Sequence, residues 1–343
     1  MFKVVLSHAL CEEGMALLRR QMDVDTVVAN TVDESELLPL LKDADAFILR
    51  MGKMNKRMLQ LCPRMKVIAR PGVGVDTIDV DYAAEHGIPV VVTPGANSRS
   101  VAEHTMALLL ALSKNLPESL EKAKMGQYDV RNKYAAFELY GKTLGVMGFG
   151  HIGKITAQIA SAFGMRIAVY DPYVPSETIC ALGYHACSSV EEILPICDMI
   201  TLHMQSNAQT RGMIGERELS AMRRGALLVN CARGDLVCED ALYNALRDGH
   251  LGGAAEDMMS SEPFDLSSPL LTLPNFLASP HMAALTREAS ARAAVMAVEG
   301  TLAVLHGENG PMCIERTCMI TDNGRTLKIK RREKYVDAPG CAR

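Results

Sequence analysis

The chain has 343 residues and a formal net charge of −4 at pH 7, with 48% hydrophobic and 22% charged residues. This length is typical of about two domains, and the composition excludes intrinsic disorder, collagen-like repeats and coiled coil as the main architecture. The longest apolar run, Met106–Leu112, is far shorter than the ~20 residues that a membrane-spanning helix needs. Ten scattered cysteines without a Cys-x-x-Cys pair, and an N-terminus without a secretory signal, indicate reduced thiols and a cytoplasmic location.

The charge is unevenly distributed along the chain. Seven basic and two acidic residues give the segment from Gly324 onward a charge of +5, which leaves −9 for the rest. A mildly acidic body argues against nucleic acid as a partner. For the basic tail we expect a solvated, poorly ordered terminus, the alternative being a contact with RNA or a membrane.

Short apolar segments alternate with helix-like segments in the first third of the chain. Five of the short segments are rich in Val and Ile and have the length of buried parallel strands: Lys3–Leu6, Val24–Val28, Ala46–Leu49, Val67–Ala69 and Val90–Val92. The segments between them have helical periodicity: Glu12–Gln21, Glu34–Leu41, Asn55–Leu61 and Tyr82–His86. This alternation is typical of βαβ units and predicts an open parallel sheet.

A second alternating region follows a long helix predicted at Ser100–Ser113 and a polar, less patterned stretch from Asn115 to Tyr140. Its predicted strands are Thr143–Met147, Arg166–Tyr170, Met199–Leu202, Ala226–Asn230, Ala254–Asp257 and Phe276–Ala278. Its predicted helices are Ile152–Phe163, Val190–Ile196, Glu216–Met222 and Glu239–Arg247, and a last helix runs from Thr286 to His306 before Gly307. The chain is therefore expected to form two open α/β domains.

A glycine-rich loop, Gly148-Phe149-Gly150-His151-Ile152-Gly153, joins a predicted strand to a predicted helix. Such a loop lets the backbone approach a pyrophosphate, and the helix N-terminus offers N–H groups to the anion. Asp171 ends the next strand, where its carboxylate would accept hydrogen bonds from ribose hydroxyls and repel a 2′-phosphate. The loop therefore predicts a dinucleotide site that prefers NAD to NADP, against the alternative of a structural turn.

From about residue 40 to 306 the chain resembles the D-isomer-specific 2-hydroxyacid dehydrogenases, in particular the D-3-phosphoglycerate dehydrogenase branch. Besides the glycine loop, the resemblance rests on Ala69-Arg70-Pro71-Gly72-Val73-Gly74-Val75-Asp76, Thr93-Pro94-Gly95-Ala96-Asn97, Ser100-Val101-Ala102-Glu103, Asn230-Cys231-Ala232-Arg233-Gly234, Glu262-Pro263 and Ser279-Pro280-His281. It implies two Rossmann- or flavodoxin-like domains, with the NAD-binding domain at 99–286 inserted into a substrate domain of 1–98 and 287–343. The tail from about residue 311 diverges from the family's usual ending.

The resemblance implies three catalytic residues. His281 would be the acid/base, because imidazole exchanges protons near neutral pH. Glu262 would be its carboxylate partner, which favours the imidazolium and selects the tautomer. Arg233 would hold the substrate carboxylate with its guanidinium fork. Each residue, taken alone, has an ordinary structural or surface interpretation.

Further positions follow from the same resemblance. Cofactor contacts are expected from Gly148, Gly150, His151, Ile152, Gly153, Asp171, His203, Cys231 and Asp257, with Asp257 near the nicotinamide carboxamide. Substrate contacts are expected from Arg50, Arg70, Val73, Gly74 and Asn97, the two arginines matching phosphate ligands of phosphoglycerate dehydrogenases. No residue set is assigned to a metal.

The chain departs from the family pattern at three places near these motifs. Leu202-His203-Met204-Gln205-Ser206 replaces the usual Leu-His-x-Pro-Leu, and His104 replaces a leucine. Glu256 stands where an aliphatic residue normally precedes the strand-end Asp257, which places a charge near the predicted nicotinamide pocket.

The function expected from the sequence is NAD-dependent oxidation of a small 2-hydroxy acid, with 3-phosphoglycerate as the preferred substrate. A hydroxypyruvate or glyoxylate reductase is the alternative within this class. An NAD(H)-responsive interaction module on the same fold is the alternative of another class. The stretch Ala102–Tyr140 resembles the segment through which these enzymes pair, which predicts a homodimer without nucleic-acid or membrane partners.

Overall fold

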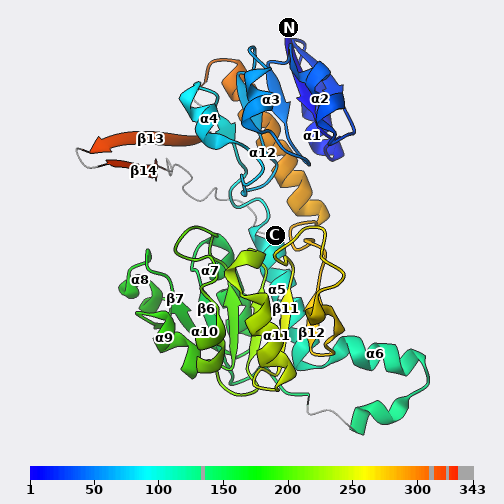
Figure 1. Ribbon diagram of the computed structural model, residues 1–343, viewed down its shortest axis with the longest axis vertical. Coiled ribbons are helices and arrows are strands. Elements are labelled where there is room, and N and C mark those ends of the chain that lie inside the picture. The colour runs from blue at the N-terminus through cyan, green and yellow to red at the C-terminus, as the bar shows by residue number, and fades with distance from the viewer. Residues whose placement is uncertain (133–135, 309–312, 322–323, 331–343) are drawn as a thin grey trace. The chain divides into compact units, whose positions relative to one another are not determined.

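The computed structural model describes residues 1–132, 136–308, 313–321 and 324–330, and for the last two ranges only the backbone. The chain divides into unit 1, which comprises Met1–Asn97 and Thr286–Arg343, and unit 2, which comprises Ser98–Leu285. Each unit is a seven-stranded sheet covered by helices (Figure 1), so the predicted α/β class with two open sheets is confirmed. No helix in the described ranges combines the length and hydrophobicity of a membrane span.

The sheet of unit 1 has the strand order β14-β13-β5-β4-β3-β1-β2. Its first five strands pair in parallel and match the predicted segments within two residues: β1 (Phe2–Leu6), β2 (Val24–Val28), β3 (Ala46–Ile48), β4 (Val67–Ala69) and β5 (Val90–Val91). β3 and β4 are buried along their whole length, which explains why they consist only of apolar residues.

Helices cover both faces of this sheet. One face packs against α1 (Glu12–Arg19) and α12 (Arg287–Leu305), and the other against α2 (Glu34–Leu41), α3 (Lys56–Gln60) and α4 (Val80–Glu85). α12 begins where the Thr286 side chain accepts a hydrogen bond from the Ala289 amide. A side chain at Gly14 would come within 2.8 Å of Ala294 Cβ, so glycine lets α1 and α12 approach closely.

The described part of the C-terminal tail forms two strands, β13 (Cys313–Thr321) and β14 (Gly324–Lys330). β13 pairs antiparallel with β14 and with β5, so it adds an antiparallel edge to the parallel sheet. This differs from the poorly ordered terminus expected for this segment. The basic residues after position 330 lie outside the described residues.

The sheet of unit 2 is parallel throughout, with the order β12-β11-β10-β9-β6-β7-β8. Its strands are β6 (Thr143–Met147), β7 (Arg166–Tyr170), β8 (His185–Ala186), β9 (Met199–Leu202), β10 (Leu227–Asn230), β11 (Gly253–Glu256) and β12 (Phe276–Ala278). Six of the seven were predicted. β8 and the short helix α8 (Ser176–Cys180) were missed because two and five residues are too few to display a period.

Helices also cover both faces of the unit 2 sheet. α5 (Ser98–Ser113) and α7 (His151–Ala162) pack on one face, and α9 (Val190–Ile193), α10 (Glu216–Ala221) and α11 (Glu239–Arg247) on the other. Single turns of 3₁₀ helix complete the connections: η2 (Leu194–Ile196), η3 (Gly234–Leu236) and η4 (Pro269–Thr272). This three-layer packing exposes one edge of the sheet, formed by the carboxyl ends of its strands.

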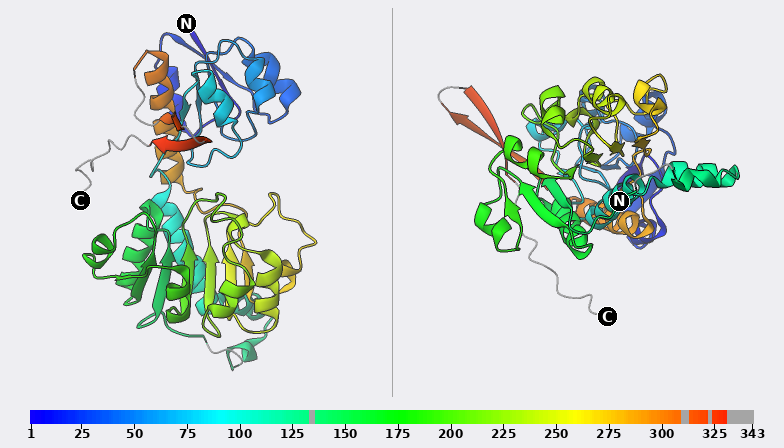
Figure 2. Two further views of the ribbon diagram at one scale, coloured as in Figure 1. Left: turned by 60° about the vertical axis from the view of Figure 1, so that its left-hand side comes forward. Right: turned by 90° about the horizontal axis from the view of Figure 1, so that it is seen from below.

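The stretch from Asn115 to Tyr140, expected to be polar and less patterned, contains α6 (Leu116–Lys124) and the 3₁₀ turn η1 (Tyr128–Asn132). α6 has no buried residue, and it extends away from the sheet of its own unit (Figures 1 and 2). Leu120, Met125 and Tyr128 are 53%, 63% and 73% exposed. These side chains of α6 and of the segment after it form an apolar surface that the described residues of unit 2 leave largely exposed.

Candidate active site

Three adjacent strands of unit 2 end at residues singled out from the sequence. Arg233 follows β10, Asp257 follows β11 and His281 follows β12, and β11 lies between the other two. Because neighbouring strands lie ~4.8 Å apart, the ends of β10 and β12 are separated by about 10 Å. The sheet thus brings residues 24 positions or more apart in sequence to one edge.

His281 and Glu262 form a direct pair. His281 Nδ1 lies 2.8 Å from Glu262 Oε1, and the two side chains are 46% and 42% exposed. Glu262 comes from the loop after β11, and its bond to Nδ1 leaves Nε2 as the nitrogen that can face a substrate. The backbone of His281 has φ +48°, a left-handed conformation that costs a non-glycine residue energy and is concentrated at functional sites.

Asp257 organises the turn that carries His281. Its backbone carbonyl accepts from the His281 amide at 2.8 Å. Its carboxylate accepts from Ser279 Oγ at 2.5 Å and from the amides of Met282 and Ala283, both at 2.9 Å. Although burial acts to raise it, these hydrogen bonds and one from His104 hold the pKa of Asp257 below its usual value. The ionised Asp257 carboxylate therefore stabilises this turn through hydrogen bonds, a role not predicted from the sequence.

His104 belongs to the same network. From α5 its Nε2 lies 3.0 Å from Ser279 Oγ and 3.5 Å from Asp257 Oδ1. The sequence showed it only as a departure from the family pattern. The contacts with Ser279 and Asp257 account for a histidine in place of the usual leucine, because a leucine side chain could not form a hydrogen bond with either residue.

Arg233 lies in a turn held by Asn230. The Asn230 side chain donates to the Arg233 carbonyl at 2.8 Å and accepts from the Ala232 amide at 3.0 Å. Arg233 Nη1 donates to the Ala232 carbonyl at 2.7 Å. A side chain at Gly234 would come within 2.1 Å of the Met259 backbone, so only glycine lets this turn pack against the loop that leads to Glu262.

The glycine loop fits a dinucleotide pyrophosphate. A Cβ at Gly148 would lie 2.8 Å or less from the backbone of His203 and Met204, and one at Gly153 only 2.0 Å from the Gly148 carbonyl oxygen. At Gly150, by contrast, a Cβ would meet nothing within 4 Å. α7 begins at His151 without a side-chain cap, so its first N–H groups, including those of His151 and Ile152, face this open space.

The other predicted cofactor residues surround the point where the sheet order reverses, between β6 and β9. Asp171 accepts from the amides of Phe149 and Tyr173 at 2.7 and 2.8 Å, and these bonds orient its carboxylate beside the loop. Burial lowers the pKa of His203 to about 3, so its ring is neutral. Burial raises the pKa of Cys231 to about 12, so it remains a thiol.

The predicted substrate residues belong to unit 1. Arg50 and Arg70 come directly after the neighbouring strands β3 and β4 or one residue beyond them. Arg50 Nη1 donates to the Ala9 carbonyl at 2.9 Å, and Arg70 Nη1 to Thr77 Oγ1 at 3.2 Å. Val73, Gly74 and Asn97 are half-buried. The roles of these five residues remain predictions.

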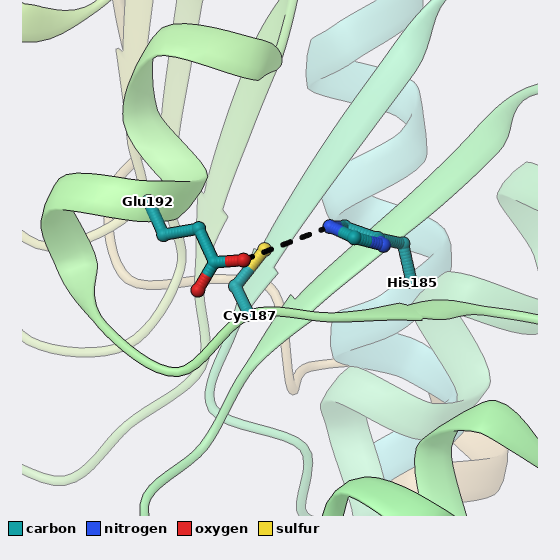
Figure 3. Close-up of side chains that lie close together, drawn as sticks. All are labelled: His185, Cys187 and Glu192. Atoms are coloured by element: carbon teal, nitrogen blue, oxygen red, sulfur yellow. Dashed lines mark ion pairs between the residues drawn. The ribbon is translucent and has the colours of Figure 1, made fainter.

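A separate cluster of side chains lies at the other end of the unit 2 sheet (Figure 3). Among the described residues, His185, Cys187 and Glu192 place potential metal-ligand atoms within 4.8 Å of one another. His185 and Glu192 are 62% and 41% exposed and 3.9 Å apart, and the other Glu192 oxygen accepts from Ser188. Burial, aided by the Glu192 charge, raises the pKa of the Cys187 thiol to about 11, which disfavours the thiolate that a metal requires. We assign no metal to this cluster.

Comparison with known proteins decides the family. Residues 106–283, most of unit 2, match the model of the D-isomer specific 2-hydroxyacid dehydrogenase NAD-binding domain. The chain belongs to this family. The NAD-binding domain accordingly contains the glycine loop and the strand ends that carry Arg233, Asp257 and His281.

Individual relatives show which members of the family this chain is similar to. The chain is 42% identical over 309 residues to D-3-phosphoglycerate dehydrogenase of Methanocaldococcus jannaschii, an alignment that covers 90% of this chain and 58% of the relative. A solved structure from Thermus thermophilus has a TM-score of 0.83 at 35% identity, covering 91% of this chain and 99% of the other. An NADPH-dependent glyoxylate/hydroxypyruvate reductase of Sinorhizobium meliloti has a TM-score of 0.82 at 26% identity, covering 92% and 98%.

Proposed function

We propose that the protein is an NAD-dependent D-2-hydroxyacid dehydrogenase that oxidises 3-phosphoglycerate to 3-phosphohydroxypyruvate. The observation that carries the proposal is the 2.8 Å His281–Glu262 pair, located at the strand edge that also carries Arg233 in an NAD-binding domain. The choice of substrate is supported by the 42% identity to a D-3-phosphoglycerate dehydrogenase. Since the chain spans 58% of that relative's length, the activity and substrate remain proposals.

His281 acts as the acid/base. In oxidation the neutral ring donates its Nδ1–H to Glu262, so Nε2 holds the lone pair that takes the hydroxyl proton of the substrate. The imidazolium that results is stabilised by the Glu262 carboxylate. In reduction the same proton returns from Nε2 to the ketone oxygen.

Arg233 holds the substrate. Its guanidinium can bind a carboxylate through two parallel hydrogen bonds and keep the reacting carbon in line with Nε2 of His281. NAD, when bound, supplies the hydride acceptor. The Asp171 carboxylate would accept hydrogen bonds from the ribose hydroxyls of NAD and would repel the 2′-phosphate of NADP, so binding of NAD is favoured.

The experiment that tests the function is a panel of 2-hydroxy and 2-keto acids with NAD(H) and NADP(H). We expect the highest kcat/KM for the phosphorylated substrate with NAD(H). Preference for hydroxypyruvate or glyoxylate would instead favour the reductase, the function of the similar Sinorhizobium meliloti enzyme. NADH binding without turnover of any compound would favour an interaction module.

Substrate discrimination should depend on Arg50 and Arg70. Because each guanidinium would pair with the substrate phosphate, Arg50→Ala and Arg70→Ala should each lower kcat/KM for the phosphorylated substrate by about tenfold or more. The same variants should change kcat/KM for the unphosphorylated acid much less. Equal effects on both substrates would remove the phosphate assignment. Arg57, an exposed arginine of unit 1 beside Glu34, provides the control as Arg57→Ala.

The exposed apolar side chains of α6 and η1 support a homodimer formed through unit 2. Leu120, Met125 and Tyr128 would be covered by a second copy of this chain. Light scattering should give twice the mass of the chain for the native protein. The double variant Leu120→Glu/Met125→Glu should give the monomer mass, and a wild-type protein of monomer mass would refute the dimer.

A further inference from the structure

Glu256 is a buried carboxyl group that the proposed mechanism does not use. It is the last residue of β11, its side chain is 0% exposed, and it shares a sheet face with Ala254 in a cluster of apolar side chains. Burying a carboxyl group is costly unless hydrogen bonds compensate, so acids are almost never found at such positions. A residue that breaks this rule beside Asp257 requires a compensating role.

The only described hydrogen bond of the Glu256 side chain joins it to Asn230, its partner in the β10–β11 register. Asn230 Nδ2 donates to Glu256 Oε1 at 3.3 Å and to the Arg233 carbonyl at 2.8 Å. The Asn230 oxygen accepts from the Ala232 amide. The Asn230 amide group therefore links Glu256 to the Ala232 amide and the Arg233 carbonyl, both in the turn that carries the Arg233 side chain.

We propose that Glu256 is a positioning residue that orients the Asn230 amide and, through it, the turn that presents Arg233 to the substrate. This inference rests on the proposed function. An aliphatic side chain at position 256 would leave one Nδ2 hydrogen without an acceptor, and the Asn230 amide would be held only by its bonds to the Arg233 carbonyl and the Ala232 amide. The turn would then lose one of the restraints that fix the direction of the guanidinium.

The role requires the protonated form of Glu256. Burial, with a smaller contribution from the negative charge of Glu239, raises the pKa of Glu256 to about 8, although the bond from Asn230 opposes the shift. Glu256 Oε2 is buried without a partner among the described residues. The charged and titratable groups on the elements around β11 are Glu239 on α11, Arg233 and Cys231 after β10, His281 after β12, and Asp257 with His104 of α5. Among the described residues no hydrogen bond or ion pair that joins Glu256 to a cationic side chain is found, so the neutral acid is the favoured state near pH 7.

Ionisation would disturb the link. A buried carboxylate attracts the Asn230 N–H groups more strongly than a neutral acid does, and it would compete with the Arg233 carbonyl for Nδ2. The geometry around Arg233 should therefore be correct below about pH 8 and should deteriorate above it. The effect should fall mainly on the keto-acid carboxylate, since the glycine loop that would hold the pyrophosphate of NADH belongs to β6 and α7.

Two variants at position 256 distinguish the effect of the hydrogen-bond acceptor for Asn230 from the effect of the ionisable proton of Glu256. Glu256→Gln keeps an oxygen for Asn230 but cannot ionise, whereas Glu256→Leu removes the oxygen at similar volume. The control is Asp45→Asn, because Asp45 is a buried acid of unit 1 that pairs with Arg64 and Lys66. We would measure kcat/KM for the 2-keto acid, and KM for NADH, between pH 6.5 and 9.5.

At pH 7 Glu256→Leu should lower kcat/KM for the keto acid by about tenfold with KM for NADH unchanged, and Glu256→Gln should retain the wild-type value. Above pH 8 the wild type should lose activity more steeply than Glu256→Gln; a loss that both proteins share belongs to groups other than Glu256. Wild-type activity and pH profile in Glu256→Leu, or the full wild-type decline in Glu256→Gln, would overturn the inference. Asp45→Asn should leave both the profile and kcat/KM unchanged.

A second readout does not depend on turnover. Between the ordinary glutamate pKa of 4.5 and about 8, folded Glu256 keeps a proton that the unfolded chain releases. The folded state therefore loses stability as pH rises through this window, and the loss is complete above it. Glu256→Gln should resist urea better than the wild type at pH 8.5, with the difference shrinking toward pH 5; a difference independent of pH would contradict the protonated state.

The proposed function and the positioning role of Glu256 can be refuted independently of each other. An active wild type whose Glu256 variants behave like it would refute only the positioning role. A wild type that turns over no keto acid would refute the proposed function, and calorimetric binding of the keto acid to the NADH-loaded protein would then test the Glu256 variants. Equal affinity of wild type and Glu256→Leu for the keto acid would refute the positioning role in that case as well.

Discussion

Replacement of His281 by Asn is expected to lower turnover by about 10³-fold, because positioned acid/base groups contribute 10²–10⁴-fold and asparagine cannot take the hydroxyl proton. The variant should still bind NADH with near wild-type affinity, since the glycine loop that receives the pyrophosphate lies after β6 and His281 after β12. Steady-state kinetics with the best substrate of the panel, together with NADH fluorescence titration, would measure both quantities.

Two further variants serve as a comparison and a control for His281→Asn. Glu262→Gln retains a hydrogen-bond acceptor for His281 Nδ1 but loses the charge that stabilises the imidazolium, so a smaller loss of about 10–100-fold is expected. His185→Asn removes an exposed histidine of unit 2 far along the sheet, at β8, and should be fully active. Full activity of His281→Asn would refute the acid/base assignment.

Replacement of Arg233 by Lys is expected to lower kcat/KM for the 2-keto acid by about 100-fold, although the positive charge is conserved. A lysine ammonium cannot make the two parallel bonds of a guanidinium, and a misoriented substrate loses alignment with the acid/base. KM for NADH should stay within about twofold of wild type, because Arg233 acts on the substrate alone. Single-turnover and steady-state measurements on the same variant would separate binding from chemistry.

The matched control is Arg217→Lys, which changes an exposed arginine of α10 that pairs with Glu191. It should leave kcat/KM unchanged, since exposed ion pairs contribute little and Arg217 belongs to neither proposed site. If Arg233→Lys and Arg217→Lys behaved alike, the substrate carboxylate would have to be bound by other residues. The role of Arg233 in the proposed mechanism would then be refuted.

Much of the fold could be predicted from the sequence because the relevant signals are local. Short, mostly apolar segments identified every strand of three or more residues before the tail. The signal is clearest in β3 and β4, which are buried along their whole length and contain only apolar residues. The glycine loop could be assigned because its glycines satisfy steric demands: a Cβ at Gly153 would overlap the Gly148 carbonyl. The helix α6 was missed because it lies in a stretch interpreted as polar and less patterned, and its Leu116 and Leu120 are only half-buried.

The candidate site was predicted less completely. The contacts of Asp257 within the protein were not predicted: its carboxylate accepts hydrogen bonds from Ser279 Oγ and from the amides of Met282 and Ala283, and these hold the turn of His281. His104 was visible only as an unusual residue. The sequence could not reveal these bonds, because α5 and the turn after β12 are about 175 residues apart and meet only through the order of the sheet.

By itself the sequence determined the α/β class and the place of the glycine loop, because side-chain periods and glycine spacing are properties of neighbouring residues; the proposed reactive groups came from the resemblance to the family. Tertiary structure decided which groups meet: it paired His281 with Glu262, joined His104 to Asp257 and buried Glu256 against Asn230. The physical reason is that a parallel sheet places strand ends side by side in an order that the chain does not follow. The partners of a charge, and hence its protonation, depend on that order.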